Sequence, residues 1–221
     1  MAEPTITFGA AASFGAQTGW NENGSSVNVA SDRGVALDEI GNEVASQLHN
    51  ERTEVSTNYA SAATAAPTIP ATLGAIVNSL VLTGISVQTS GTGFATMTLT
   101  GHNHTDNAHG VSPALASVAH GISITTGWGG VDFLGGTAGD NAAVESSSLE
   151  ITCEHTDVTG ATGNHLVGDN HGPKISATTV WNGAPSTPVG DGWDKVSVST
   201  ETTNQGFLKT TVTAEKSLAF S

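Results

Sequence analysis

Basic residues are scarce in this chain of 221 residues. Lys and Arg together number 6, against 20 Asp and Glu, which gives a formal net charge of −14 at pH 7. Such a surface repels phosphate backbones, so tight sequence-specific binding of nucleic acid is not expected. Charged residues of both signs make up only 12% of the chain, well below the usual share, which excludes a highly charged disordered tail.

Cysteine and long apolar runs are scarce as well. The single cysteine, Cys153, excludes an internal disulfide framework and a site with several thiolate ligands. No run approaches the roughly 18 apolar residues that would span a membrane. Residues 1–5 lack a basic region followed by an apolar stretch, so no secretory signal is expected. We therefore expect a protein made in a cytoplasm, with no membrane partner.

What the chain has in abundance is small and β-forming residues. It contains 27 glycines and many Thr, Ser and Ala, a composition typical of turns and pleated strands. Apolar residues alternate with polar ones, which predicts half-buried antiparallel strands with Met97, Leu99, Ile151 and Val212 in the core. The fold class expected is all-β: an antiparallel β-sandwich or barrel-like domain with an extended N-terminal arm and long loops. The strands are predicted at 81–88, 94–101, 121–126, 148–154, 175–181, 195–201 and 207–214.

An internal repeat organises two of these regions. Residues 84–101 can be laid over residues 197–214 so that Ile85 matches Val198 and Leu99 matches Val212. Each copy has the pattern of a strand, a polar turn and a second strand, and a chance similarity of Thr-rich strands is the alternative. The repeat predicts two similar hairpins.

Residues 27–60 allow two interpretations. Leu37, Ile40, Val44 and Leu48 recur at helical spacing. The alternation farther along the segment and the turn signal at Gly41 instead favour two strands around a turn. A glycine inside a helix costs about 1 kcal/mol relative to alanine. We expect the hairpin, with a helix over 35–50 as the alternative.

Two segments look poorly suited to packing within their own subunit. Residues 1–26 are rich in Gly and Ala and are assigned to an N-terminal arm, with residues 27–221 as the folded domain. The Gly-rich stretch 127–141 is predicted to be a long loop. Aromatic residues on flexible segments tend to bury in partner grooves. The predicted anchors at subunit interfaces are Phe8, Phe14, Trp20 and Phe133.

No catalytic constellation is found, so we expect no enzyme and no cofactor. The chain has neither a Gly-x-Ser-x-Gly elbow nor a phosphate-binding glycine fingerprint. Cys153 lies in an alternating strand pattern and is expected to be a buried small hydrophobe. His102 and His104 lie two apart and would share a strand face, and imidazole suits zinc, copper, iron or nickel. The candidate metal set is His102, His104, Asp106, His109, His155, His165 and His171. The preferred interpretation is that these histidines are solvated or lie at an interface, with no metal bound.

Three stretches of the chain resemble tail tube (major tail) proteins of long-tailed bacteriophages. They are residues 30–60, 82–109 and 193–218, the last with a Gly-Phe at the start of its final strand. The resemblance covers less than half of the chain and carries no catalytic residue. It implies a β-sandwich or barrel-like domain that forms hexameric rings, which stack into a tube around a DNA channel. The implied partners are further copies of the chain and other tail proteins, and the implied location is the virion.

The negative charge agrees with a conduit, because a wall that repels phosphates lets DNA pass without sticking. Free strand edges, dangerous for a monomer, become useful where neighbouring copies pair them. The acidic residues expected to face the lumen are Asp106, Asp132, Asp140, Glu150 and Glu154. The alternatives are a capsid-decorating or adhesin-type sandwich and a histidine-rich metal-binding protein.

Overall fold

The computed structural model describes residues 13–62, 66–104, 117–161, 165–202 and 208–219. Within these ranges all regular elements are strands and no helix occurs. The strands are β1 (Trp20–Leu37), β2 (Glu43–Ser61), β3 (Thr72–Leu73), β4 (Ile76–Val77), β5 (Leu80–Ser90), β6 (Thr96–His104), β7 (Val118–Ala119), β8 (Ala143–Thr159), β9 (His165–Asn182), β10 (Lys195–Thr202) and β11 (Leu208–Ser217).

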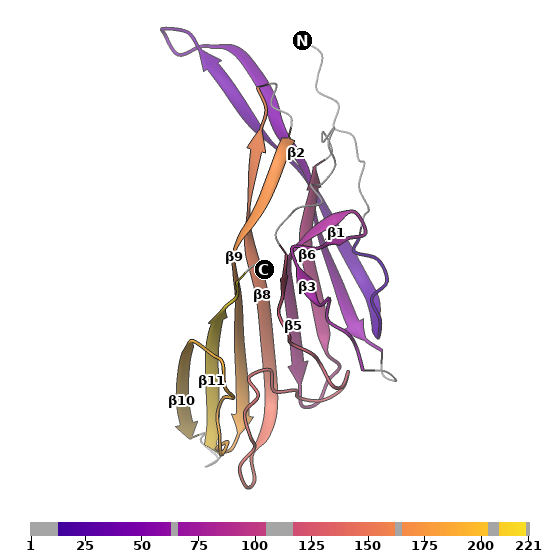
Figure 1. Ribbon diagram of the computed structural model, residues 1–221, viewed down its shortest axis with the longest axis vertical. Coiled ribbons are helices and arrows are strands. Elements are labelled where there is room, and N and C mark those ends of the chain that lie inside the picture. Colours follow the sequence, from indigo (N-terminus) through magenta and orange to yellow (C-terminus); the bar gives the residue numbers. More distant parts are fainter. Residues whose placement is uncertain (1–12, 63–65, 105–116, 162–164, 203–207, 220–221) are drawn as a thin grey trace.

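Nine strands form one large antiparallel sheet (Figure 1). Its order is β1-β2-β6-β5-β8-β9-β11-β10, and β4 pairs with β5 beside this path. Strands β3 and β7 form a separate two-stranded sheet. The predicted all-β antiparallel class is therefore confirmed. The sheet is open, however, with β1 and β10 at its two ends, so it does not close into a barrel.

The hydrophobic core lies between one face of the large sheet and a covering layer of connecting segments. The sheet contributes apolar side chains such as Leu99 and Ile151, and the connections contribute Leu73, Ile124 and Leu134. The result is sandwich-like, although the second layer is mostly loops. The strand predicted at 121–126 is absent, since regular pairing in that region is limited to β7.

The predicted alternation sets which face of each strand is buried. Met97, Leu99, Ile151 and Val212 are all at most 1% exposed. Glu150, next to Ile151, is exposed on the opposite face. Since successive side chains on a strand point to opposite faces, the predicted register is confirmed.

The internal repeat corresponds to two hairpins with the same register. Ile85 pairs with Leu99 in the β5–β6 hairpin. The matching residues of the second copy, Val198 and Val212, pair with each other between β10 and β11. The two copies differ in position, because β5 lies inside the sheet whereas β10 is an edge strand.

The ambiguous segment 27–60 forms a long hairpin, and the helical alternative is wrong. Strands β1 and β2 pair from Trp20–Ser61 to Leu37–Glu43. Asp38 closes the turn, because its carboxylate accepts hydrogen bonds from the backbone N–H groups of Ile40 and Asn42 at 3.0 and 2.8 Å. Gly41 adopts a φ of 89°, a conformation that favours glycine. Leu37, Val44 and Leu48 therefore lie on the two strands of a hairpin, and Ile40 in its turn, although their spacing would also fit a helix.

Three of the four predicted interface anchors lie in the chain's own core. Phe14, Trp20 and Phe133 are 1%, 6% and 6% exposed, so their assignment to contacts with other subunits is wrong. Phe8 lies outside the described residues. The flexible-looking segments pack because local polar groups fix them. The carboxylate of Asp132, for example, accepts hydrogen bonds from the backbone N–H groups of Leu134 and Gly136.

Candidate metal centre

The candidate site is a cluster of histidines beyond the N-terminal end of the central strand β5, which begins at Leu80. Strand β5 pairs with β6 as far as Val81–His102 and with β8 as far as Gly84–Thr152. Beyond these pairs no described strand separates β6 from β8. The distal parts of the two strands can therefore contact each other directly, and both carry histidines there.

Alternation on the strands aims these side chains at one another. His102 and His104 lie on the same face of β6, and His155 and Asp157 on the same face of β8. This face of β6 is opposite the one that carries Met97 and Leu99, so the site lies on the side of the sheet away from the main core. His102 and His104 are nevertheless only 8% and 5% exposed.

A single carboxylate oxygen lies at the centre of the cluster. Asp157 Oδ1 is 2.8 Å from His155 Nε2 and 3.1 Å from His165 Nε2, both within hydrogen-bonding geometry. His104 Nε2 lies 3.0 Å from the same oxygen, but outside hydrogen-bonding angles. Three imidazole nitrogens from three strands thus converge on one atom.

The rings pack closely around this centre. The rings of His104 and His165 stack, with centroids 3.7 Å apart and planes 9° apart. The rings of His102 and His155 are 4.2 Å apart at a tilt of 57°. The potential ligand atoms of His102, His104, His155 and Asp157 all lie within 4.8 Å of one another.

Burial and neighbouring charges set the protonation of the cluster. Burial, together with His155 and His104, lowers the pKa of His102 to about 3, so this imidazole is neutral at pH 7. Burial alone would raise the pKa of Asp157, but the contacts from His104 and His155 outweigh it and the pKa lies well below its usual range. Burial alone would lower the pKa of His155, but hydrogen bonds to Asp157 and Asn170 raise it overall. The site therefore contains an ionised carboxylate and at least one neutral imidazole.

Two residues of β9 support this arrangement. Asn170 Oδ1 lies 2.7 Å from His155 Nδ1, which directs the other ring nitrogen towards Asp157. Gly168 pairs with Asp157 across the β8–β9 ladder. A Cβ atom at Gly168 would come within 2.5 Å of His155 Nε2 and 3.1 Å of Asp157 Oδ1. Only a glycine therefore leaves room for this contact.

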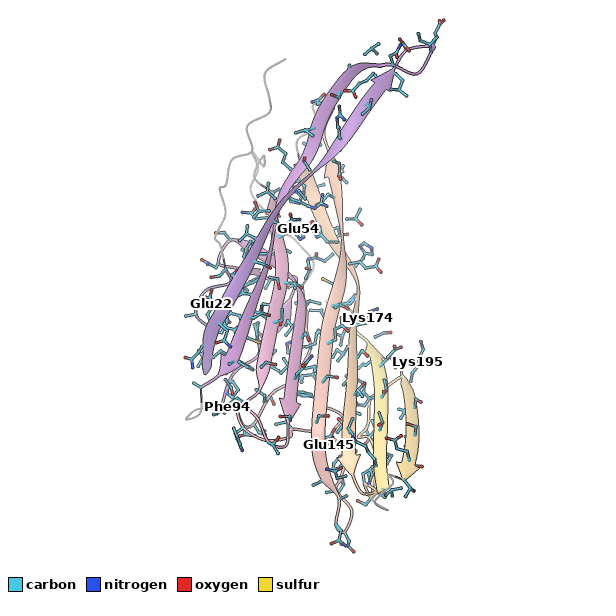
Figure 2. The ribbon with its side chains drawn as sticks, turned by 180° about the vertical axis from the view of Figure 1, so that it is seen from behind. Glu22, Glu54, Phe94, Glu145, Lys174 and Lys195 are labelled. Atoms are coloured by element: carbon cyan, nitrogen blue, oxygen red, sulfur yellow. The ribbon has the colours of Figure 1, made fainter. Side chains whose placement is uncertain are left out.

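A polar groove of about 640 Å³ gives access to the cluster. Its walls include Asn28 and Asp32 from β1, Arg52 and Glu54 from β2, and, at the cluster, His102, His155 and Asp157. Glu54, labelled in Figure 2, marks the β2 side of this groove. Arg52 is paired there, with its Nε 2.8 Å from Glu54 Oε1 and its Nη1 3.7 Å from Asp32 Oδ2.

The structure brings together four of the seven residues in the candidate metal set. His102, His104, His155 and His165 meet around Asp157, a residue that was not included in the set. The preferred interpretation of solvated or interface histidines is wrong for His102 and His104. Asp106 and His109 lie outside the described residues, and the exposed His171 lies apart, with its Nε2 3.1 Å from Glu154. The sequence signal for Asp157 is His155-Thr156-Asp157 on β8. As in His102-Asn103-His104, one residue separates two possible ligands, so both side chains lie on one face of the strand.

The acidic residues expected to face a lumen have different environments. Glu150 and Glu154 are exposed on β8, and Asp140 is exposed in the loop before it. Asp132 is held inside its own loop, where it also accepts a hydrogen bond from Thr179 at 2.7 Å. Asp106 lies outside the described residues.

Cys153 lies next to the cluster but has a different character. Its thiol is partly buried, its Sγ is 3.8 Å from the carbonyl oxygen of Thr83, and burial raises its pKa to about 11. A neutral thiol is a poor nucleophile and a poor metal ligand. These properties favour the predicted packing role.

Comparison with protein-family models finds no match, and no curated protein is significantly similar to the chain. Among the described residues, no helix has the length and apolar character needed to cross a membrane.

Since no similar protein indicates a role for the cluster, its chemical interpretation depends on its own geometry. Imidazole nitrogens and a carboxylate around one point form a donor set suited to a divalent transition metal.

Proposed function

We propose that this chain is a structural protein of a long-tailed bacteriophage, which assembles into rings that stack into a tail tube and let DNA pass. The observation that supports this proposal best is the open sheet, with strands β1 and β10 at its ends. Open edges present unpaired backbone N–H and C=O groups, which a second copy can satisfy.

Strand β10 has the properties of an edge that another subunit covers. All eight of its residues are exposed, including Val196 and Val198 at 46% and 48%. An edge strand of a soluble monomer is usually protected by charges, bulges or proline. In β10 the charged residues, Lys195 and Glu201, lie near its two ends, and residues 196–200 between them are uncharged. Pairing of β10 in one copy with β1 in the next is a heterologous contact, and repeated rotation by such a contact closes a ring.

The β1–β2 hairpin offers a second assembly surface. It extends beyond the body of the sheet to one end of the molecule (Figure 1). Apolar side chains are exposed along its distal part, with Val35 at 46%, Leu37 at 61%, Ile40 at 83% and Val44 at 64%. Apolar surface concentrated on a projection is typical of a protein contact. In the proposed tube, the hairpin packs against the adjacent ring.

The charge of the chain suits a channel. With 20 acidic and 6 basic residues, it offers few groups that would hold phosphates. Glu150 is exposed on the face of the sheet that the covering loops leave open. In the proposal this face lines the lumen, and other tail proteins bind the ends of the tube.

The experiment compares two lysine substitutions at exposed strand positions. Val198→Lys places a charge on the edge strand β10, whereas the control, Gln88→Lys, places the same charge on the central strand β5. Concentrated protein is examined by light scattering after size-exclusion chromatography and by negative-stain electron microscopy. We expect rings or tubes for the wild type and for Gln88→Lys, and mainly monomers for Val198→Lys.

A wild-type chain that stays monomeric at high concentration contradicts the proposal. Closed trimers without tubes favour the capsid-decorating alternative instead. DNA retention at low salt is the second test, because a conduit should retain little DNA. Strong, salt-sensitive retention would contradict an acidic channel.

A further inference from the structure

We propose that His102, His104, His155 and Asp157 bind a divalent transition-metal ion of the zinc type, which links β6 to the β8–β9 hairpin. The four side chains come from two strands that β5 no longer separates. Their potential ligand atoms lie within 4.8 Å of one another, so one ion can reach all four with small side-chain movements.

The donor set selects the class of metal. Three imidazoles and one carboxylate give the four ligands of a tetrahedral zinc site. Calcium and magnesium prefer sites built of oxygen ligands alone, and soft copper(I) prefers sulfur. Zinc is therefore the best probe, and cobalt(II) can replace it as a spectroscopic reporter.

Unsatisfied nitrogen atoms give an independent indication of a ligand. His102 Nε2 and His104 Nδ1 are buried without a hydrogen-bond partner among the described residues, and the contact of His104 Nε2 is with Asp157 Oδ1 at 3.0 Å. Buried polar atoms in native proteins nearly always have partners, so each exception needs an explanation. A bound ion would supply a partner for His102 Nε2 and for one nitrogen of His104.

The spacing of the ligands is compatible with such an ion. His155 Nε2 and His104 Nε2 lie 2.8 and 3.0 Å from Asp157 Oδ1. Ligands about 2.1 Å from a common zinc ion in tetrahedral geometry lie roughly 3.4 Å apart. A slight opening of the cluster therefore accommodates the ion.

The surroundings also match those of metal sites. A histidine ligand usually donates its second N–H to an oxygen acceptor, which fixes the tautomer. Asn170 Oδ1, 2.7 Å from His155 Nδ1, is placed to accept this hydrogen bond. His165 is a positioning residue, because its ring stacks on His104 and its Nε2 lies 3.1 Å from Asp157. The groove that reaches His102, His155 and Asp157 provides an entry path.

The test uses the full chain, stripped of metal with a chelator and titrated with ZnCl₂ by calorimetry and with CoCl₂ by visible absorption. We expect one ion per chain, an intense tetrahedral cobalt spectrum, and a rise in Tm with added zinc. His102→Ala and Asp157→Asn should each weaken binding roughly tenfold or more. Gly168→Ala should also weaken it, because the added Cβ would come within 2.5 Å of His155 Nε2, the nitrogen that would bind the ion.

The matched control is His171→Ala, which removes an exposed histidine outside the cluster and should leave the affinity unchanged. Far-UV circular dichroism checks that each variant is folded. If a variant does not fold, the wild-type stoichiometry and cobalt spectrum decide. The proposal is overturned if the wild type binds no zinc, if its cobalt spectrum is weak and octahedral, or if His171→Ala lowers the affinity as much as His102→Ala.

Discussion

Replacement of Phe14 by alanine is the most direct test of how the N-terminal segment packs. The Phe14 side chain is 1% exposed and belongs to the hydrophobic core. Its backbone N–H donates a hydrogen bond to Thr57 Oγ1 at 3.2 Å, which fixes the segment against β2. The ring lies over Gly101, where an added Cβ would come within 2.8 Å of Phe14 Cζ. The segment is therefore part of the fold and not a free arm.

The expected loss of stability follows from this burial. Removal of a fully buried phenylalanine ring costs the transfer free energy of its carbon atoms and leaves a cavity, together about 3–5 kcal/mol. Urea unfolding followed by tryptophan fluorescence measures the change in the free energy of unfolding. Phe94→Ala is the control, because Phe94 (labelled in Figure 2) is 47% exposed and meets Trp128 edge-on at 4.7 Å. For Phe94→Ala we expect the free energy of unfolding to fall by about 1 kcal/mol.

A loss below about 1 kcal/mol for Phe14→Ala would refute the argument, because a core ring cannot be removed so cheaply. Deletion of residues 1–20 extends the test. The deletion removes both Phe14 and Trp20. The indole N–H of Trp20 donates a hydrogen bond to the carbonyl oxygen of Thr68 at 2.9 Å. We expect the truncated chain to unfold, whereas a separate arm would leave the domain intact.

Three further predictions concern buried or partly buried side chains. Tyr59, the only tyrosine, donates a hydrogen bond to the carbonyl oxygen of Gly15, and burial raises its pKa to about 12. The resulting stabilisation is complete below pH about 10 and is lost as the pH rises towards about 12, so the absorbance of tyrosinate should appear only with unfolding or near that pH. Burial raises the pKa of Cys153 to about 11, so alkylation near neutral pH should be slow in the folded protein and fast in urea, and equal rates would contradict this. Leu99→Ala should cost about 2–5 kcal/mol in urea unfolding, and a near-neutral result would place Leu99 outside the core.

Much of the strand layout could be predicted because it depends on local pattern. Alternation around Met97, Leu99 and Ile151 identifies both the strand and its buried face, since the side-chain period of a strand is 2. The repeat predicts two hairpins in the same way, and the pairs Ile85–Leu99 and Val198–Val212 confirm it. A turn built around Asp38 and Gly41 likewise depends on neighbouring residues alone.

Local pattern could not predict the packing of the two segments that are rich in small residues. Composition describes how freely residues 1–26 and 127–141 move in isolation. It does not reveal that Phe14, Trp20 and Phe133 find room in a core made by distant strands. That room depends on long-range neighbours, such as Gly101 beneath Phe14.

Local patterns along the chain establish the β-rich class, the acidic surface, most strands with their buried faces, and the presence of histidines two residues apart on a strand. The contact of those histidines with Asp157, in contrast, follows from the folded arrangement of the strands. This contact requires that β5 does not extend between the distal parts of β6 and β8. It also requires a glycine at position 168 of β9, where any side chain would obstruct the contact. Alternation along a strand acts between adjacent residues, whereas a buried polar cluster depends on which strands become neighbours and where each one ends.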